Sequence, residues 1–209
     1  MDPQQEYEEK IKNMSPEELK EFQKKQCIFC QIISSKVQSR KLFSDDDCTA
    51  VLDINPANPG HILLLPNEHY AIMPLIPDKT TGKLSRVAKG LSNAILKGLK
   101  AGGTTVFIAN GLVAGQKAQH FMMHVIPRMA DDGIEFKLPA KQMTANDMHE
   151  VQKRIKKRLY EILGVKDMVT EELPAKRETS HVEEKKPAEK PAKTDAGQTD
   201  LDSISRLFK

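Results

Sequence analysis

The sequence lacks a long apolar run, a large excess of one charge and a dense set of cysteines. No stretch of about 18 apolar residues is present, so we expect neither a membrane-spanning helix nor a membrane partner. The 32 basic and 29 acidic residues give a net charge of +3, too small to indicate a nucleic-acid partner. The polar, acidic start Met1-Asp2-Pro3-Gln4-Gln5-Glu6 is unlike a secretory signal. We therefore expect a cytoplasmic protein.

Only three cysteines are present, which does not suit a disulfide framework. Cys48 stands alone in an apparent strand and is expected to be a small buried residue. The pair in Cys27-Ile28-Phe29-Cys30 suits a metal site or a redox pair. With His69 and His120 downstream, it predicts a tetrahedral Cys2His2 zinc site at one end of a sheet, for which His61 competes with His69. Two buried thiols without a ligand are the alternative, and a thioredoxin-like pair is less favoured because no strand precedes it.

The length of 209 residues suits one compact domain with extensions. Between Glu171 and Thr199 the chain consists mainly of Lys, Glu, Pro, Ala and Thr, which predicts disorder because little apolar surface can be buried. The predicted divisions are an N-terminal helical extension (1–26), the compact domain (27–130), a C-terminal helical extension (131–168) and a disordered tail (169–209).

Local patterns predict an α+β domain. Ser15-Pro16 begins a helix that runs to about residue 26, and three short strands at 42–44, 49–54 and 61–66 form an antiparallel meander. Two further strands, 104–109 and 120–127, are joined by a glycine-containing loop. The two longer helices are predicted from apolar stripes: Leu84, Val87, Leu91, Ile95 and Leu99 before Gly102-Gly103, then Met148, Val151, Ile155, Leu159 and Ile162 before Gly164.

The end of the chain regains an apolar pattern between Leu201 and Phe208. A short amphipathic motif on a flexible tether suits docking into the groove of a protein partner. A terminal turn without a partner is an equal alternative, because short isolated helices are marginally stable.

The most informative segment is His120-Phe121-Met122-Met123-His124. Side chains alternate between the faces of a strand, so His120, Met122 and His124 point the same way. Two imidazoles therefore flank a thioether. Met122 packing in the core, and His124 as a satisfied polar residue at a strand edge, are the plain structural alternatives.

Several motifs in a fixed order resemble the histidine triad (HIT) family of nucleotide hydrolases and transferases. They are Cys-Ile-Phe-Cys at 27–30, Leu-Asp-Ile-Asn-Pro-Ala-Asn-Pro-Gly-His-Ile-Leu-Leu-Leu-Pro-Asn-Glu-His at 52–69, Asn110-Gly111, Gly115-Gln116 and His-Phe-Met-Met-His-Val-Ile-Pro-Arg at 120–128. The resemblance covers about residues 25 to 130. It implies a homodimer of an α+β fold with a five-stranded antiparallel sheet, acting on nucleoside phosphates, phosphoramidates or dinucleoside polyphosphates.

The resemblance also assigns roles by position. It implies that Asp53 binds ribose hydroxyls, Ile54 lines the base pocket, Asn110 holds the phosphate or the strand geometry, Gln116 approaches the leaving-group oxygen, and His124 binds phosphate. Cys27, Cys30, His69 and His120 match the zinc site of the Cys-x-x-Cys branch.

Met122 occupies the place of the family's middle histidine, the nucleophile that takes the nucleotidyl group. A thioether has no comparable basicity and forms no useful phosphoryl intermediate. Lys117 stands where a small hydroxyl residue is common, and its ammonium can neutralise a phosphate. We therefore expect a zinc-stabilised purine nucleotide or dinucleotide-binding protein with weak or no covalent catalysis. An active hydrolase or transferase using His124, His120 or an activated water, with Gln116 at the leaving group, is the first alternative. An interaction scaffold recruiting a partner through its tail is the second.

Overall fold

The computed structural model describes residues 11–135 and 137–165, which fall into two compact units divided between Pro139 and Ala140. The predicted tail (169–209) and its motif at 201–208 lie outside the described residues. The elements of the first unit are α2 (Pro16–Gln26), α3 (Ile28–Ile33), β1 (Lys41–Ser44), β2 (Cys48–Leu52), β3 (Ile62–Pro66), η1 (Met73–Leu75), α4 (Asp78–Gly98), β4 (Gly103–Phe107), η2 (Leu112–Ala114) and β5 (Met123–Arg128). The second unit contains α5 (Ala145–Leu163).

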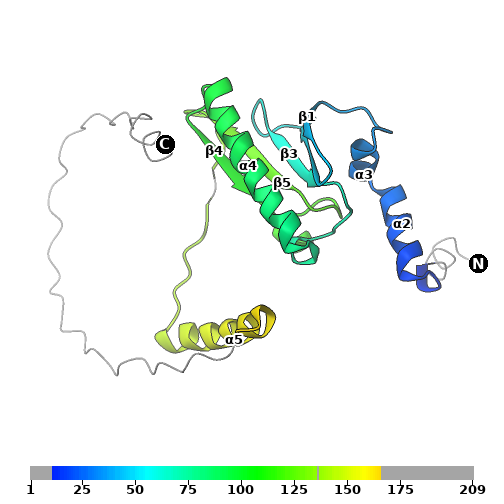
Figure 1. Ribbon diagram of the computed structural model, residues 1–209. Helices are drawn as coiled ribbons and strands as arrows, with labels where there is room; N and C mark the ends of the chain where they lie inside the picture. The colour runs from blue at the N-terminus through cyan, green and yellow to red at the C-terminus, as the bar shows by residue number, and fades with distance from the viewer. Residues whose placement is uncertain (1–10, 136, 166–209) are drawn as a thin grey trace, which may run out of the picture. The chain divides into compact units, whose positions relative to one another are not determined.

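The five strands form one antiparallel sheet in the order β1-β2-β3-β5-β4 (Figure 1). This confirms the predicted fold class. The consecutive strands β1, β2 and β3 form the expected meander, and β4 pairs with β5. Pairing of β3 with β5, with Leu63 opposite His124, joins the two parts of the sheet. Segments far apart in the sequence therefore meet at the centre of the sheet.

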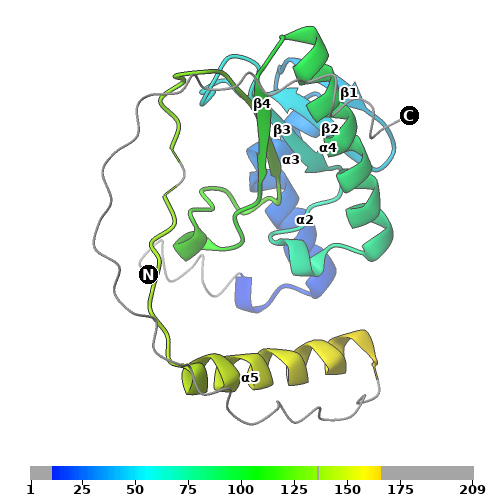
Figure 2. The same cartoon turned by 90° about the vertical axis from the view of Figure 1, so that its left-hand side faces the viewer.

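Alternation along the strands sorts apolar side chains onto two faces. The helix α4 lies along one face (Figure 2) and buries Leu84, Ala88 and Ile95 there. The strand residues of the same cluster include Ala50, Ile62, Leu64, Met123 and Val125. A second cluster contains Val51, Leu63 and Leu65, with Phe29, Ile32, Ile33 and Met122 packed against them. The sheet is therefore covered on one face by α4 and on the other by side chains of α3.

The strand that carries the histidines is shorter than its pattern predicts. We expected it to begin at His120, but β5 begins at Met123. The Phe121 N–H donates to the carbonyl oxygen of Tyr70 at 2.6 Å, so this backbone turns towards the loop after β3 instead of continuing the ladder. The side chains still alternate, because Phe121 packs in the α4 cluster and Met122 in the α3 cluster.

Two further features differ from prediction. The short helix α3 is not predicted, because its six residues, Ile-Phe-Cys-Gln-Ile-Ile, are apolar except for Gln31 and show no helical period. The helix α4 ends at Gly98, before the expected Gly102-Gly103, and Lys100 adopts the left-handed φ of 52°. Gly103 instead begins β4.

The cap at Ser15 and the helix end at Gly164 match the sequence signals. The Ser15 hydroxyl accepts from the Glu18 N–H at 3.3 Å, and the Glu18 carboxylate accepts from the Ser15 N–H at 2.8 Å, which completes a capping box. Thr144 caps α5, whose last turn closes at Gly164 with φ 63°. Among the described residues, no helix is both long enough and apolar enough to cross a membrane.

Candidate functional site

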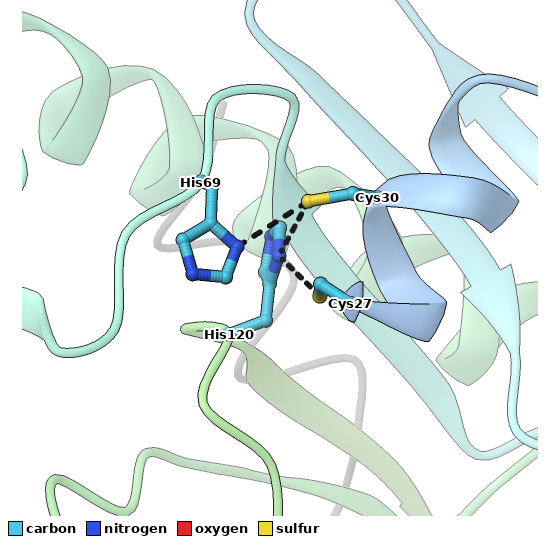
Figure 3. A group of neighbouring side chains, drawn as sticks. All are labelled: Cys27, Cys30, His69 and His120. Atoms are coloured by element: carbon cyan, nitrogen blue, oxygen red, sulfur yellow. Dashed lines mark hydrogen bonds between the residues drawn. The ribbon is translucent and has the colours of Figure 1, made fainter. Parts of the chain in front are cut away.

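The four predicted metal ligands meet in one group (Figure 3). Cys27 precedes α3, Cys30 lies one turn into it, His69 follows β3, and His120 precedes β5. One ligand atom from each residue lies within 4.8 Å of all the others. His61, the predicted competitor of His69, is not part of this group.

The distances between the ligand atoms fit a tetrahedral zinc ion. Cys30 Sγ lies 3.3 Å from His69 Nδ1 and 3.5 Å from His120 Nδ1, and Cys27 Sγ lies 3.5 Å from His120 Nδ1. Zinc bonds of about 2.3 Å to sulfur and about 2.0 Å to nitrogen, at tetrahedral angles, separate the two ligand atoms by about 3.5 Å. The group therefore has the size and the donor set that zinc requires.

The surroundings of the group prepare it for a cation. The His120 Nε2–H donates to the Pro66 carbonyl oxygen at 3.1 Å, which directs the Nδ1 lone pair towards the other ligands. Burial lowers the pKa of His120 to about 4 and also lowers the pKa of His69, so both rings are neutral at neutral pH. Burial raises the pKa of Cys30 to about 12, and a bound metal displaces the thiol proton.

Ion pairs join α2 to the loop that carries His69. Glu68 lies 2.7 Å from Lys20 Nζ and 3.0 Å from Lys24 Nζ. These side chains are partly exposed, and such pairs contribute at most about 1 kcal/mol each. The ion pairs therefore matter for position more than for stability, because they hold α2 beside His69.

A second cluster of titratable side chains lies around His124. His61 Nε2 is 3.0 Å from His124 Nδ1, and His61 Nδ1 is 3.3 Å from an Asp53 oxygen. The Phe107 ring stacks on His124 with centroids 4.3 Å apart. We call Asp53, His61, Phe107 and His124 the histidine pocket. It combines imidazoles, which can donate to an anionic group, with one carboxylate, which can accept hydrogen bonds from hydroxyl groups.

Hydrogen bonds assign the protons in the histidine pocket. The Ala57 N–H donates to His61 Nδ1 at 3.2 Å, so in the neutral ring Nε2 carries the proton and donates to His124 Nδ1. The neutral His124 ring then carries its own proton on Nε2. That nitrogen can donate to a phosphate oxygen, whereas a nucleophile needs a lone pair there.

Burial keeps both imidazoles neutral. It lowers the pKa of His61 and that of His124, although the Asp53 carboxylate opposes the shift at both rings. The positive charge that His61 carries when it is protonated further lowers the pKa of His124. A bound phosphate would supply the negative charge that favours the protonated ring.

The other predicted site residues lie in the loops around these clusters. The Asn110 side-chain oxygen accepts from the Met73 N–H at 2.9 Å. The Gln116 amide accepts from the Gly111 N–H at 2.6 Å and donates to the carbonyl oxygens of Ala71 and Ala118, so here it organises the loop. The expected base-pocket residue Ile54 is 90% exposed, and Lys117 is exposed as well.

The interpretation of the sequence missed the role of His61 in this cluster. We considered it only as a possible metal ligand. The strand pairing explains its position, because Leu63 is opposite His124 and His61 lies two residues before Leu63, on the same face. Alternation of side chains along the strand places His61 and Leu63 on one face. That pattern indicates a contact with His124 only when β3 and β5 are known to be neighbours.

Comparison with known proteins gives consistent relatives. The family model of the HIT domain matches residues 34–131. An uncharacterized HIT-like protein of Borreliella burgdorferi is 42% identical over 114 residues, covering 53% of this chain and 81% of that protein. A second, from Methanocaldococcus jannaschii, is 37% identical over 62% of this chain and 98% of its own length. The adenosine 5'-monophosphoramidase of Saccharomyces cerevisiae is 32% identical over 62% of this chain and 80% of that enzyme.

Solved structures agree with these matches. A Streptococcus mutans protein superposes with a TM-score of 0.61 at 28% identity, covering 64% of this chain and 85% of that one. A histidine triad nucleotide-binding protein from Candida albicans gives 0.59 at 29% identity, covering 65% and 99%. A zinc-bound histidine triad family protein from Mycobacterium smegmatis gives 0.52 at 25% identity, covering 66% and 99%.

Proposed function

Because this chain belongs to the histidine triad (HIT) family, we propose that it binds a purine nucleotide or dinucleotide polyphosphate and that covalent nucleotidyl transfer is weak or lost. The observation that carries this proposal is the surroundings of Met122. Its side chain packs against the apolar cluster of Val51, Leu63 and Leu65. No basic nitrogen therefore occupies the position of the nucleophile.

The histidine pocket supplies the groups for binding. We assign the phosphate to His124, whose Nε2–H can donate, and the ribose hydroxyls to the Asp53 carboxylate. His61 holds the His124 ring in the donating tautomer. Ile54 would cover the base and lose its exposure on binding, while Lys117 would add a positive charge near the phosphates.

For the metal group we propose a structural zinc ion. All four positions of a tetrahedron are taken by Cys27, Cys30, His69 and His120, which leaves none for a substrate. The ion would tie α3 and the His69 loop to the segment before β5. We retain the predicted divisions at 26, 130 and 168 and the cytoplasmic location as part of this proposal.

Nucleotide affinity should rise as the pH falls. Free His124 has a lowered pKa and is neutral at neutral pH, whereas a phosphate favours its protonated form, so binding takes up a proton. Between about pH 7.5 and the lowered pKa of His124, the affinity should increase by about tenfold or more, because hydrogen bonds to charged groups are worth about 1.5–3 kcal/mol. Calorimetric titration with a diadenosine polyphosphate measures this, since its bridging phosphates do not titrate in that range.

The variant His124→Ala should bind at least about tenfold more weakly and lose most of the pH dependence. His149→Ala in α5 is the matched control, because it removes an exposed histidine outside the HIT domain and should leave the titration unchanged. The absence of saturable heat with the wild-type protein would contradict the binding function.

An active hydrolase or transferase is the second candidate, and one observation favours it. The His61–His124 pair, 3.0 Å apart, is neutral at neutral pH. If His61 took up a proton on Nδ1 beside Asp53 and passed its Nε2 proton to His124 Nδ1, His124 could release its own Nε2 proton to solvent, which would expose a lone pair on that nitrogen. Turnover of an adenosine phosphoramidate by the wild type that disappears in His124→Ala would favour this candidate.

We also propose a homodimer that pairs through β4. β1 is protected by Lys41 and an irregular register, whereas the edge strand β4, Gly-Thr-Thr-Val-Phe, carries no charge. Val106→Lys, at a 45% exposed position, should convert the dimer to monomer in sedimentation velocity. Thr104→Val, on the same strand, is the matched control and should leave the dimer intact. A wild-type monomer would refute this assembly.

A further inference from the structure

Within its own unit, the helix α5 leaves a continuous apolar face uncovered. Spacings of three and four residues place its large aliphatic side chains on one side. They are between 44% and 78% exposed in the structure. The α5 stripe consists of Met148, Val151, Ile155, Leu159 and Ile162. Since α5 begins after residue 131, this surface is an addition to the matched HIT domain.

Cations border the α5 stripe on both sides at its middle. At about 100° per residue, Arg154 and Arg158 lie beside one edge of the stripe and Lys156 beside the other. Lys153 and Lys157 project from the far face. Five cations therefore surround the central turns of the helix.

Two of the three acidic side chains of α5 are used close to the ends of the helix. Asp147 accepts from the Thr144 hydroxyl at 2.7 Å in the N-terminal cap. Glu161 pairs with Arg158 at 2.7 Å near the C-terminus. Glu161 partly neutralises Arg158, so the positive charge along the middle of the stripe comes mainly from Arg154 on one side and Lys156 on the other.

This charge arrangement disfavours a second α5 helix as the occupant. In an antiparallel pair each border meets its own copy, so Arg154 and Arg158 face the same arginines. In a parallel pair those arginines face Lys156 of the copy. Both orientations bring like charges together, which costs energy in helix pairs.

We propose that α5 lies flat on an anionic lipid bilayer, with the α5 stripe at the boundary between headgroups and acyl chains. Strong segregation of apolar and charged faces with low overall hydrophobicity is typical of interfacial helices. Anionic headgroups complement both borders. Their potential also reaches the far-face Lys153 and Lys157, since it extends about 10 Å at moderate salt, whereas an acidic protein groove would leave these residues outside.

An interfacial helix does not need the long apolar run whose absence led us to expect no membrane partner. The described residues between β5 and α5 contain no helix or strand. Membrane association would thus add to the nucleotide-binding function without using any of its residues.

The test is flotation of the full chain with vesicles. Wild-type protein should bind vesicles of phosphatidylcholine with phosphatidylserine at least about tenfold more tightly than vesicles of phosphatidylcholine alone, and raised salt should weaken the binding. Ile155→Gln/Leu159→Gln should reduce binding by at least about tenfold, because two aliphatic side chains leave the bilayer contact. Glutamine keeps the helix propensity high, and circular dichroism checks that the helix persists.

Leu138→Gln is the matched control, because Leu138 is 92% exposed but lies outside α5, and it should leave vesicle binding unchanged. Equal binding to both kinds of vesicle, no binding, or unchanged binding by the double variant would each overturn the proposal. So would a double variant that alters only the oligomeric state, which would identify a second copy as the occupant.

Discussion

Met122→His is expected to create phosphoramidate-cleaving activity, with turnover at least about 10²-fold above the wild type. The new imidazole would stand between His120 and His124, where its nitrogen could form a bond to phosphorus as the bond from phosphorus to the amine breaks. The amine would leave protonated, and water would then hydrolyse the bond between histidine and phosphorus. With phosphorus placed at position 122, His120 and His124 would be too far away to attack it, because alternate residues of an extended chain lie about 6.5 Å apart and reacting atoms must approach to about 3–3.5 Å. Release of amine from an adenosine phosphoramidate measures the rate.

Met122→Gln is the matched control for this gain. It introduces a polar side chain of similar size into the same partly apolar position, but it offers no nucleophile. It should remain as inactive as the wild type, while Met122→His/His124→Ala should lose most of the new activity. Wild-type turnover equal to that of Met122→His would show that the Met122 side chain does not limit catalysis.

Loss of the metal is expected to have the largest effect on stability. Structural zinc in small peptides contributes about 10–16 kcal/mol of apparent binding free energy, which is coupled to folding. We expect Cys27→Ser or a strong chelator to lower the free energy of unfolding by about 3 kcal/mol or more and the Tm by about 10 °C. Thermal denaturation measures the loss, and metal analysis should give one zinc per chain in the wild type but not in Cys27→Ser.

Cys48→Ala provides the control for the metal. Cys48 is fully buried in the α4 cluster, so this change should cost some stability through packing while leaving the zinc content at one per chain. In Cys27→Ser the chelator should have little further effect. Chelator-insensitive stability of the wild type would argue against a structural metal.

The metal group was predictable because its members carry rare, chemically distinct side chains. Cys27, Cys30, His69 and His120 could be selected from the sequence before any contact was known. The short helix α3 was not predictable, since its residues lack a period. Its shape follows from Phe29, Ile32 and Ile33 packing on the sheet, a contact with distant residues such as Leu63.

The histidine pocket illustrates the same limit. Asp53 and His124 were identified by motif, but the bond from His61 to His124 depends on β3 and β5 being neighbours. The beginning of β5 likewise depends on the hydrogen bond between Phe121 and Tyr70, which local propensity does not encode. What remained unpredictable arises from pairing between distant parts of the chain.

The separation of the ligands along the chain bears on the order of folding. Cys27 and His120, whose side chains lie 3.5 Å apart, are 93 residues apart in sequence, and His120 adjoins the strand that pairs with β3. Closing this loop costs entropy before any contact forms, so we expect contacts of this kind to form late. A metal bound early by the two cysteines would leave the loop to His120 still to be closed. We expect the ion to slow unfolding instead, because its four ligands come together only after the sheet has assembled.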